Sequence, residues 1–145
     1  MHSRLKLLFL CTGNSCRSQM AEAWTRELKG ERIEAFSGGL EPRGVDPRAV
    51  AVMAEVGIDL SAARSKHVDD LAQVAVDHVI TVCDRASQRC PVFHGGVRVA
   101  HVGFDDPPAL ARSARSEAEA LSHYRRVRDE IRRFFETLPD ALTDA

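Results

Sequence analysis

The chain has 145 residues, and its 20 basic and 21 acidic side chains nearly balance to a net charge of −1. A chain of this length buries enough surface to fold as one domain without stabilising cross-links, so we expect a single domain over residues 1–145. The balanced charge argues against a general nucleic-acid binder, whose binding face is strongly basic.

The N-terminal sequence does not resemble a targeting segment. Its apolar run, Leu7–Leu10, is far too short for the core of a signal peptide, and no cleavage site follows it. We therefore expect a cytoplasmic protein that makes no membrane contact. In that reducing compartment, the four cysteines of the chain are more consistent with catalytic or metal-binding roles than with static disulfides.

Strand and helix patterns alternate along the first part of the chain. Leu5–Leu10 is a continuous apolar run that predicts a buried strand, and Ser18–Leu28 has apolar residues at helical spacing. Ile33–Ser37 predicts a second strand. An aspartate followed by proline then predicts a helix over residues 46–57, which a glycine ends.

The alternation continues to the C-terminus. A short helix is predicted over Val68–Ala75, followed by strands over Val76–Val82 and Val97–Val102. The last helix is predicted over Ser116–Leu138, and Pro139 ends it. Its predicted buried stripe consists of Leu121, Tyr124, Val127, Ile131, Phe135 and Leu138. This order predicts an α/β fold with a four-stranded parallel sheet, helices on both faces, and ligands beyond the carboxyl ends of the strands.

The segment Cys11–Ser18 joins the first predicted strand directly to the first predicted helix. A small-residue loop in this position directs backbone N–H groups and the positive end of the helix dipole toward one place, where an anion can bind. The same field lowers the pKa of a thiol, so Cys11 would supply a thiolate. The planar guanidinium of Arg17 can hold two oxygens of a tetrahedral oxyanion. The predicted oxyanion-binding residues are Thr12, Gly13, Asn14, Ser15, Cys16, Arg17 and Ser18.

A second segment, Cys83–Arg89, has the same spacing and also follows a predicted strand. It contains no glycine, and Asp84 beside the cysteine would repel an oxyanion. The first loop has no acidic residue, and it has Gly13 for unusual backbone angles. We therefore place the nucleophile at Cys11, against the simpler interpretation of a buried cysteine that packs at a strand end.

Three features make the chain resemble the low-molecular-weight protein tyrosine phosphatase fold family, and within it the thioredoxin-coupled arsenate reductases. They are the loop Cys11–Ser18, the pair Cys83 and Cys90, and the run Gly103–Pro107. The loop and the run are shared with the phosphatases. The cysteine pair is typical of the reductases, because reduction consumes two electrons. The resemblance covers nearly the whole chain.

The resemblance implies a protein that reduces arsenate to arsenite. It assigns Cys11 as the nucleophile, Arg17 as the oxyanion clamp and Asp106 as the general acid. It also implies that Asn14 shapes the loop and that Ser18 donates a hydrogen bond to the thiolate. Phosphate or sulfate would bind the same loop as mimics of arsenate.

The same resemblance implies a relay of thiols that needs no cofactor and no metal. Cys83 attacks the sulfur of Cys11 and arsenite leaves, after which Cys90 attacks Cys83 and thioredoxin opens the last disulfide. Arg85 and Arg89 lie close to the relay cysteines in the sequence and would favour their thiolates.

The chain departs from the family pattern at three places. Val102 stands where many relatives have tryptophan. Lys66 stands where some relatives have an acidic residue that helps to bind potassium, and a lysine disfavours a bound cation. Pro108 and Ala109 follow Asp106-Pro107 where phosphatases tend to carry aromatic residues that grip a phosphotyrosine ring.

Other interpretations of the thiols stay open at this point. The chain could be a phosphatase of the same fold in which Cys83 and Cys90 are incidental, or a non-enzymatic sensor of oxidants. The two cysteines could also form a zinc site with His94 and His101, although their spacing fits no standard ligand pattern. Cys16 is either a packing residue or an oxidation partner of the nucleophile.

Three polar features also have simpler interpretations. Asp106 before a proline could start a turn, and Asp105 could cap or orient that turn. The arginines of the last predicted helix alternate with acidic residues, so a solvated helix face explains them. The alternative for this helix is docking of an acidic redox partner.

Overall fold

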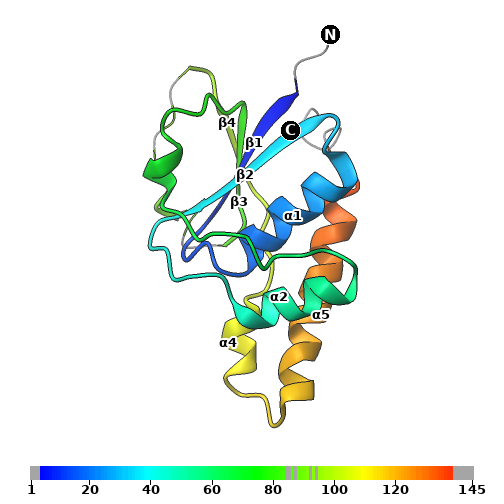
Figure 1. The fold of residues 1–145 in the computed structure, drawn as a ribbon. Coiled ribbons are helices and arrows are strands. Elements are labelled where there is room, and N and C mark those ends of the chain that lie inside the picture. Colours follow the sequence, from blue (N-terminus) through cyan, green and yellow to red (C-terminus); the bar gives the residue numbers. More distant parts are fainter. Residues whose placement is uncertain (1–3, 84–85, 87, 92, 94, 139–145) are drawn as a thin grey trace.

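The structure is a computed structural model, and it describes residues 4–83, 86, 88–91, 93 and 95–138. Strands and helices alternate along the chain, as Figure 1 shows. The elements are β1 (Leu5–Cys11), α1 (Arg17–Lys29), β2 (Ile33–Gly39), α2 (Pro47–Glu55), the 3₁₀ helix η1 (Val68–Leu71), β3 (His78–Thr81), β4 (Arg98–His101), α4 (Pro107–Ala111) and α5 (Glu117–Phe135).

The four strands form one sheet in the order β2-β1-β3-β4, and every pair is parallel. Strand β1 is therefore hydrogen-bonded on both edges. Both of its faces are also buried toward its C-terminal end, which explains why its apolar run is continuous rather than alternating. In the register of the sheet Cys11 pairs with Gly39, and Leu10 pairs with Thr81. The segments that follow β1 and β3 thus begin side by side.

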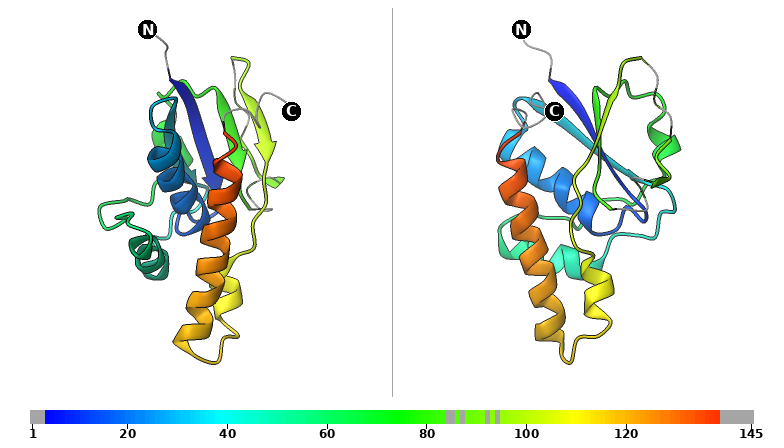
Figure 2. Two further views of the ribbon diagram at one scale, coloured as in Figure 1. Left: turned by 90° about the vertical axis from the view of Figure 1, so that its right-hand side faces the viewer. Right: turned by 180° about the vertical axis from the view of Figure 1, so that it is seen from behind.

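The helices lie around the sheet in layers. Helices α1 and α5 pack against each other on one side of the strands, and η1 lies on the opposite side against β2 (Figure 1). Helices α2 and α4 both pack on α5, beyond the end of the sheet where β1 reaches Cys11 (Figures 1 and 2). The prediction of a four-stranded parallel sheet within an α/β fold is confirmed.

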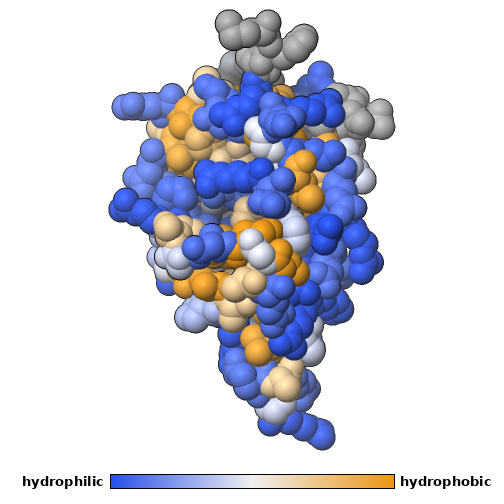
Figure 3. Space-filling view, turned by 45° about the vertical axis from the view of Figure 1, so that its right-hand side comes forward, coloured by the Kyte–Doolittle hydropathy of each residue, from blue (hydrophilic) through white to orange (hydrophobic). Residues whose placement is uncertain are grey.

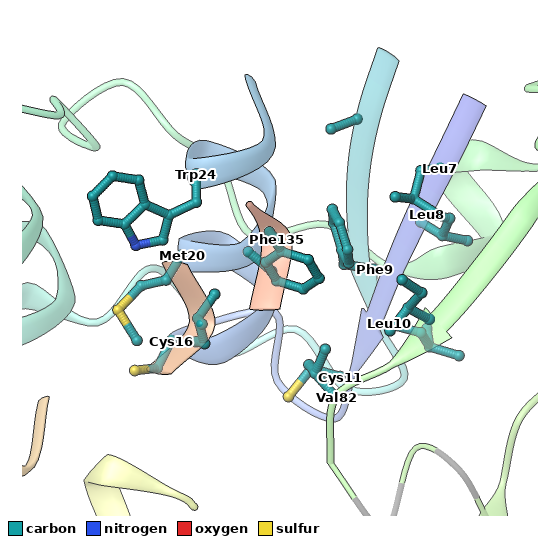
Figure 4. Close-up of a cluster of buried hydrophobic side chains, with 14 of the residues drawn as sticks. Leu7, Leu8, Phe9, Leu10, Cys11, Cys16, Met20, Trp24, Val82 and Phe135 are labelled. Carbon is teal, nitrogen blue, oxygen red and sulfur yellow. The ribbon is translucent and has the colours of Figure 1, made fainter. Parts of the chain in front are cut away.

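The core lies between the sheet and the α1–α5 pair. The rings of Phe9 and Phe135 pack with 4.9 Å between centroids and are tilted by 56°, and Met20 and Trp24 of α1 lie beside them (Figure 4). Five of the six residues in the predicted stripe of the last helix are buried, whereas Leu121 is only partly buried. Cys11 and Cys16 lie at the edge of this apolar cluster, where the core meets the loop after β1.

Several predicted elements have different bounds in the structure. The predicted helix 68–75 is the single turn η1, and the third strand begins at His78 rather than Val76. Helix α5 ends at Phe135 because Thr137 and Leu138 donate their backbone N–H groups to carbonyls three residues earlier, which tightens the chain. Pro139, predicted to end this helix, lies outside the described residues.

Sequence analysis did not predict α4, which begins with two prolines after Asp106. Proline is suited to the first turn of a helix, where its missing N–H has no intrahelical partner. The same aspartate-proline signal was correctly interpreted for α2, where Asp46 accepts a hydrogen bond from the backbone N–H of Arg48 at 2.9 Å.

The described surface is mostly polar. Figure 3 shows hydrophilic side chains over most of one face, with groups of hydrophobic side chains gathered between them. Among the described residues, Val99 on β4 is the exposed large hydrophobic side chain, at 50%. Within the same part of the chain, no helix has the length and apolar character needed to cross a membrane.

Candidate active site

A cavity of about 470 Å³ opens beyond the carboxyl ends of β1 and β3. It is lined by Cys11, Thr12, Gly13, Ser15, Cys16, Arg17, Arg43, Asp46, Cys83, Asp106, Pro108 and Arg112. The structure thus brings together the predicted nucleophile, the predicted guanidinium clamp, the predicted general acid and one of the two predicted relay thiols. The second relay thiol, Cys90, does not line this cavity.

Asn14 holds the loop between β1 and α1 in shape. It is fully buried, and its φ of 46° lies in the left-handed region. Its Nδ2 donates to Ser18 Oγ at 2.9 Å, while its Oδ1 accepts from the backbone N–H of Lys66 at 2.8 Å and from Gln19 Nε2 at 3.0 Å. Ser18 thus contacts Asn14, and its described hydrogen bonds do not include Cys11.

The expectation that Gly13 supplies the unusual backbone angle is wrong, because Asn14 has the positive φ. At Gly13 a Cβ would lie 3.3 Å from Cδ of Arg43, a close contact that a small shift of the flexible arginine side chain relieves. Gly39 at the end of β2 is more tightly constrained. Its Cβ would lie 2.8 Å from both the amide nitrogen of Asn14 and the carbonyl oxygen of Thr12.

The segment 41–46 follows the outside of the loop and binds three of its carbonyls. The backbone N–H of Glu41 donates to Thr12 O at 2.8 Å. Those of Arg43 and Asp46 donate to Gly13 O and Ser15 O, each at 3.0 Å. Because the C=O and N–H of a trans peptide point in opposite directions, the amides that follow these carbonyls point away from the segment 41–46. The loop can therefore present amide donors to an anion in the cavity.

Arg17 and Asp106 meet on one wall of the cavity. Arg17 Nη1 donates to the carbonyl of Phe104 at 3.0 Å, and Nη2 lies 3.6 Å from Asp106 Oδ1. Asp106 is the N-cap of α4, but its side chain makes no capping hydrogen bond. Its carboxylate is 42% exposed and paired with the clamp, which favours a catalytic role over a purely structural turn.

Asp105 has a different environment from its neighbour. Its carboxylate pairs with Arg126 of α5 at 3.1 Å, and it does not line the cavity. This contact ties the loop before α4 to α5, so Asp105 orients the loop that carries Asp106.

The thiols of Cys11 and Cys83 are hydrogen-bonded to each other in the cavity. A hydrogen bond with Cys83 and burial raise the pKa of the Cys11 thiol well above its usual value, although Arg17 opposes this shift. The pKa of Cys83 is lowered to about 5, first by the hydrogen bond from Cys11 and then by Thr12, whose Oγ1 lies 3.3 Å from Cys83 Sγ. The hydrogen bond thus favours the thiolate at Cys83 rather than at Cys11, contrary to the expectation of a lowered pKa at Cys11.

The second relay thiol lies apart from this pair. Cys90 is partly buried against the edge of the core, and burial raises its pKa. Between the two relay cysteines, Ala86 and Gln88 are helical. Arg89 lies 3.7 Å from Glu41 and is not among the groups that lower the pKa of Cys83, contrary to our expectation. Arg85 lies outside the described residues.

Two further residues of the cavity wall form a network that the sequence did not reveal. Cys16 is 4% exposed, and burial followed by the charge of Asp46 raises its pKa well above the usual value. The hydroxyl of Tyr124 on α5 donates to Asp46 Oδ2 at 2.5 Å. Burial and this hydrogen bond raise the pKa of Tyr124. The N-capping signal at Asp46 was visible in the sequence, but its partner on α5 was not.

The described residues contain no cluster of three or more histidine, cysteine, aspartate or glutamate side chains placed to hold a metal ion. His94, which the zinc interpretation requires, lies outside those residues. Lys66 directs its ammonium group to the carbonyl of Arg64 at 3.0 Å, beside the buried Asn14.

Comparisons with known proteins agree with this geometry. An arsenate reductase from Bacillus subtilis is 45% identical over 125 residues, covering 86% of this chain and 88% of its own length. A solved structure described as an arsenate reductase in the oxidized state superimposes with a TM-score of 0.75 and 32% identity, over 92% of this chain and 95% of that chain. An arsenate reductase in the phosphate binding state has a TM-score of 0.70 and 30% identity over the same shares.

A model of one family matches residues 6–145, which include every residue of the cavity. Its description is low molecular weight phosphotyrosine protein phosphatase. With this match and the relatives above, the chain belongs to the low molecular weight phosphotyrosine protein phosphatase family.

Proposed function

We propose that the protein is an arsenate reductase in which Cys11 attacks the oxyanion and Cys83 completes the reduction. The observation that carries this proposal is the hydrogen-bonded pair of sulfurs in one cavity with Arg17. Hydrolysis of a phosphate ester needs one nucleophilic thiol. A second thiol in contact with the first is required when the reaction must also supply two electrons.

In the first step the thiolate of Cys11 attacks arsenic, and one arsenic–oxygen bond breaks. Cys11 becomes the nucleophilic anion when its proton moves to Cys83. Arg17 and the loop amides bind the oxygens of the arsenate dianion and offset its repulsion of the thiolate. Asp106 donates a proton to the departing oxygen, a contribution of roughly 10²–10⁴-fold to the rate.

In the second step Cys83 loses its proton and attacks the sulfur of Cys11. The sulfur–arsenic bond breaks, and its electron pair remains with arsenic, which is reduced from the +5 to the +3 state and leaves as arsenite. The two sulfurs are joined in a Cys11–Cys83 disulfide. The hydrogen bond between the two sulfurs supports this step.

In the third step Cys90 attacks Cys83 and frees Cys11 as a thiolate, leaving a Cys83–Cys90 disulfide. A disulfide requires Cα atoms within about 7 Å of each other. Because Ala86 and Gln88 are helical, this closure requires the intervening segment to change conformation. An external dithiol then reduces the bond, and we propose thioredoxin as this partner. Such chemistry fits a reducing compartment, which supports a cytoplasmic location.

A coupled assay tests this function. Arsenate should drive oxidation of NADPH in the presence of thioredoxin and thioredoxin reductase, and arsenite should accumulate in equal amounts. An oxidant sensor would give neither arsenite nor arsenate-dependent NADPH oxidation. The absence of both signals with thiol-reduced, folded protein would reject the reductase assignment.

Phosphatase activity is the second candidate, because Cys11, Arg17 and Asp106 can also cleave a phosphate ester. The described residues that line the cavity include no aromatic side chain to hold an aryl ring. We therefore expect slow hydrolysis of para-nitrophenyl phosphate that depends on Cys11. If aryl phosphate hydrolysis exceeds arsenate reduction in kcat/KM by a wide margin, the phosphatase assignment replaces the reductase assignment.

A further inference from the structure

Three arginines and two aspartates, Asp46 and Asp106, line the cavity. Arg17 lies against the loop, whereas Arg43 and Arg112 line the same cavity from two other segments. The cavity of about 470 Å³ is also far larger than one tetrahedral oxyanion, since a water molecule occupies roughly 30 Å³ in the liquid. These two arginines therefore face space that a larger substrate could fill.

Arg43 is held against the loop by its backbone and its side-chain stem. Its N–H donates to Gly13 O at 3.0 Å, and its Cδ lies next to Gly13. Its side chain is 60% exposed, and its guanidinium pairs with Glu41 at 3.3 Å. The charge of Arg43 thus lies beside the mouth of the oxyanion loop, with a flexible surface carboxylate as its partner.

Arg112 lies on the same helix as the proposed general acid. Asp106 begins α4 and Arg112 ends it, which separates them by about 9 Å along the helix axis at 1.5 Å per residue. Arg112 is exposed, and it has no ion pair among the described residues. A leaving group protonated by Asp106 that extends along α4 over Pro108 would reach Arg112.

We propose that Arg43 and Arg112 form a second anion subsite that selects phosphate monoesters with a negatively charged leaving group. The substrate class is an ester whose leaving group carries a carboxylate several ångströms from the phosphate. This inference shares the Cys11 nucleophile with the proposed function and is independent of arsenate reduction. It also explains why the cavity wall has arginines where an aryl-specific site needs aromatic rings.

The reaction at this subsite is a hydrolysis and needs no reductant. Cys11 attacks phosphorus, the bond to the leaving oxygen breaks, and Asp106 protonates that oxygen. Water then attacks the cysteinyl phosphate, which releases inorganic phosphate and returns the thiolate. Arg43 and Arg112 contact only the leaving group, so they act in the first half of the reaction.

A matched pair of esters tests the proposal. The substrates are 4-carboxyphenyl phosphate and the phosphate of methyl 4-hydroxybenzoate, which differ by the charge at the far end of the ring. The measured quantity is the ratio of their kcat/KM values. Comparing this ratio between the wild-type protein and variants cancels the intrinsic reactivity of the two esters.

Arg43→Gln and Arg112→Gln should each lower the ratio about two- to fivefold, the size expected of an exposed ion pair. Arg112→Glu should lower it further, because it places a like charge at the subsite. In both glutamine variants the methyl ester should lose less activity than the carboxylate ester. Arg115→Gln is the matched control, because Arg115 is exposed and does not line the cavity. High salt should reduce the effect in the wild-type protein.

Three outcomes would overturn the subsite. They are an unchanged ratio in both glutamine variants, an equal loss of activity toward both esters, and no Cys11-dependent hydrolysis of the carboxylate ester. Arsenate reduction, measured on the same preparations, separates this test from that of the proposed function. A protein that selects the charged ester but does not reduce arsenate would keep the subsite and reject the reductase.

Discussion

Two segments of the molecule follow the neighbouring strands β1 and β3. Each begins with a cysteine and has an arginine six residues later, yet the two segments are held differently. The loop Cys11–Arg17 is fixed by hydrogen bonds from three other segments, through Asn14 and through its outward carbonyls. In the segment Cys83–Arg89, the cysteine contacts Cys11 and Thr12, and the arginine turns toward Glu41. The first segment builds a fixed anion site. The second adds a sulfur to it.

Cys11→Ser should have the largest effect, because it removes the proposed nucleophile from the first segment. This variant should lose arsenate reduction and ester hydrolysis completely, because a serine hydroxyl has a much higher pKa and cannot form the disulfide that supplies the electrons. Binding of arsenate or phosphate by Arg17 and the loop should persist in calorimetry. If the variant keeps a tenth or more of wild-type turnover, the nucleophile lies elsewhere.

Cys90→Ser separates the fixed site from the relay. It should release one arsenite per protein molecule and then stop, because Cys83 can form the first disulfide but no internal thiol can reopen it. Mass mapping of the arrested protein should find Cys11 bonded to Cys83. Cys83→Ser is the matched variant and should stop before arsenite leaves. Repeated thioredoxin-driven turnover of Cys90→Ser, or a Cys11–Cys16 bond in it, contradicts the order proposed here.

Asp106→Asn should slow the first chemical step by roughly 10²–10⁴-fold, since an amide cannot donate the proton that the leaving oxygen needs. Single-turnover release of arsenite measures this step. Asp105→Asn is the control on the neighbouring residue, and its effect should be smaller because its carboxylate faces Arg126. Equal rates for Asp106→Asn and the wild-type protein would remove the acid role from Asp106.

Thr12→Val should have the smallest effect, and it tests which of the two sulfurs carries the negative charge. The thiolate is the form that reacts with iodoacetamide, so alkylation of wild-type Cys83 should rise with pH around a pKa of about 5. Removing the Thr12 hydroxyl removes a bond to the thiolate, which should raise this pKa by about one unit. The profile is measured by mass spectrometry on protein with Cys16 and Cys90 replaced by serine. A downward shift would contradict the assignment of the charge to Cys83.

Much of the sheet and the loop could be predicted from the sequence, because the signals are local. Apolar runs mark buried parallel strands, and a glycine-containing loop before a helix marks an anion site. The contacts of Arg43, Gly39 and Tyr124 join distant segments, so no local pattern reveals them. The raised pKa of Cys11 and the lowered pKa of Cys83 could not be predicted for the same reason, since their hydrogen bond depends on the pairing of β1 with β3.

The hydrogen bonds of Asp46 connect the loop after β1 to α5, so they link oxyanion binding to the thermal stability of the fold. The backbone N–H of Asp46 donates to the carbonyl of Ser15. Its Oδ1 accepts the hydrogen bond that caps α2, and its Oδ2 accepts a hydrogen bond from the buried hydroxyl of Tyr124. The anion loop therefore cannot keep its shape once α5 detaches. We expect the ability to bind an oxyanion and the helical signal to disappear together in one cooperative transition, with no inactive but folded state between them.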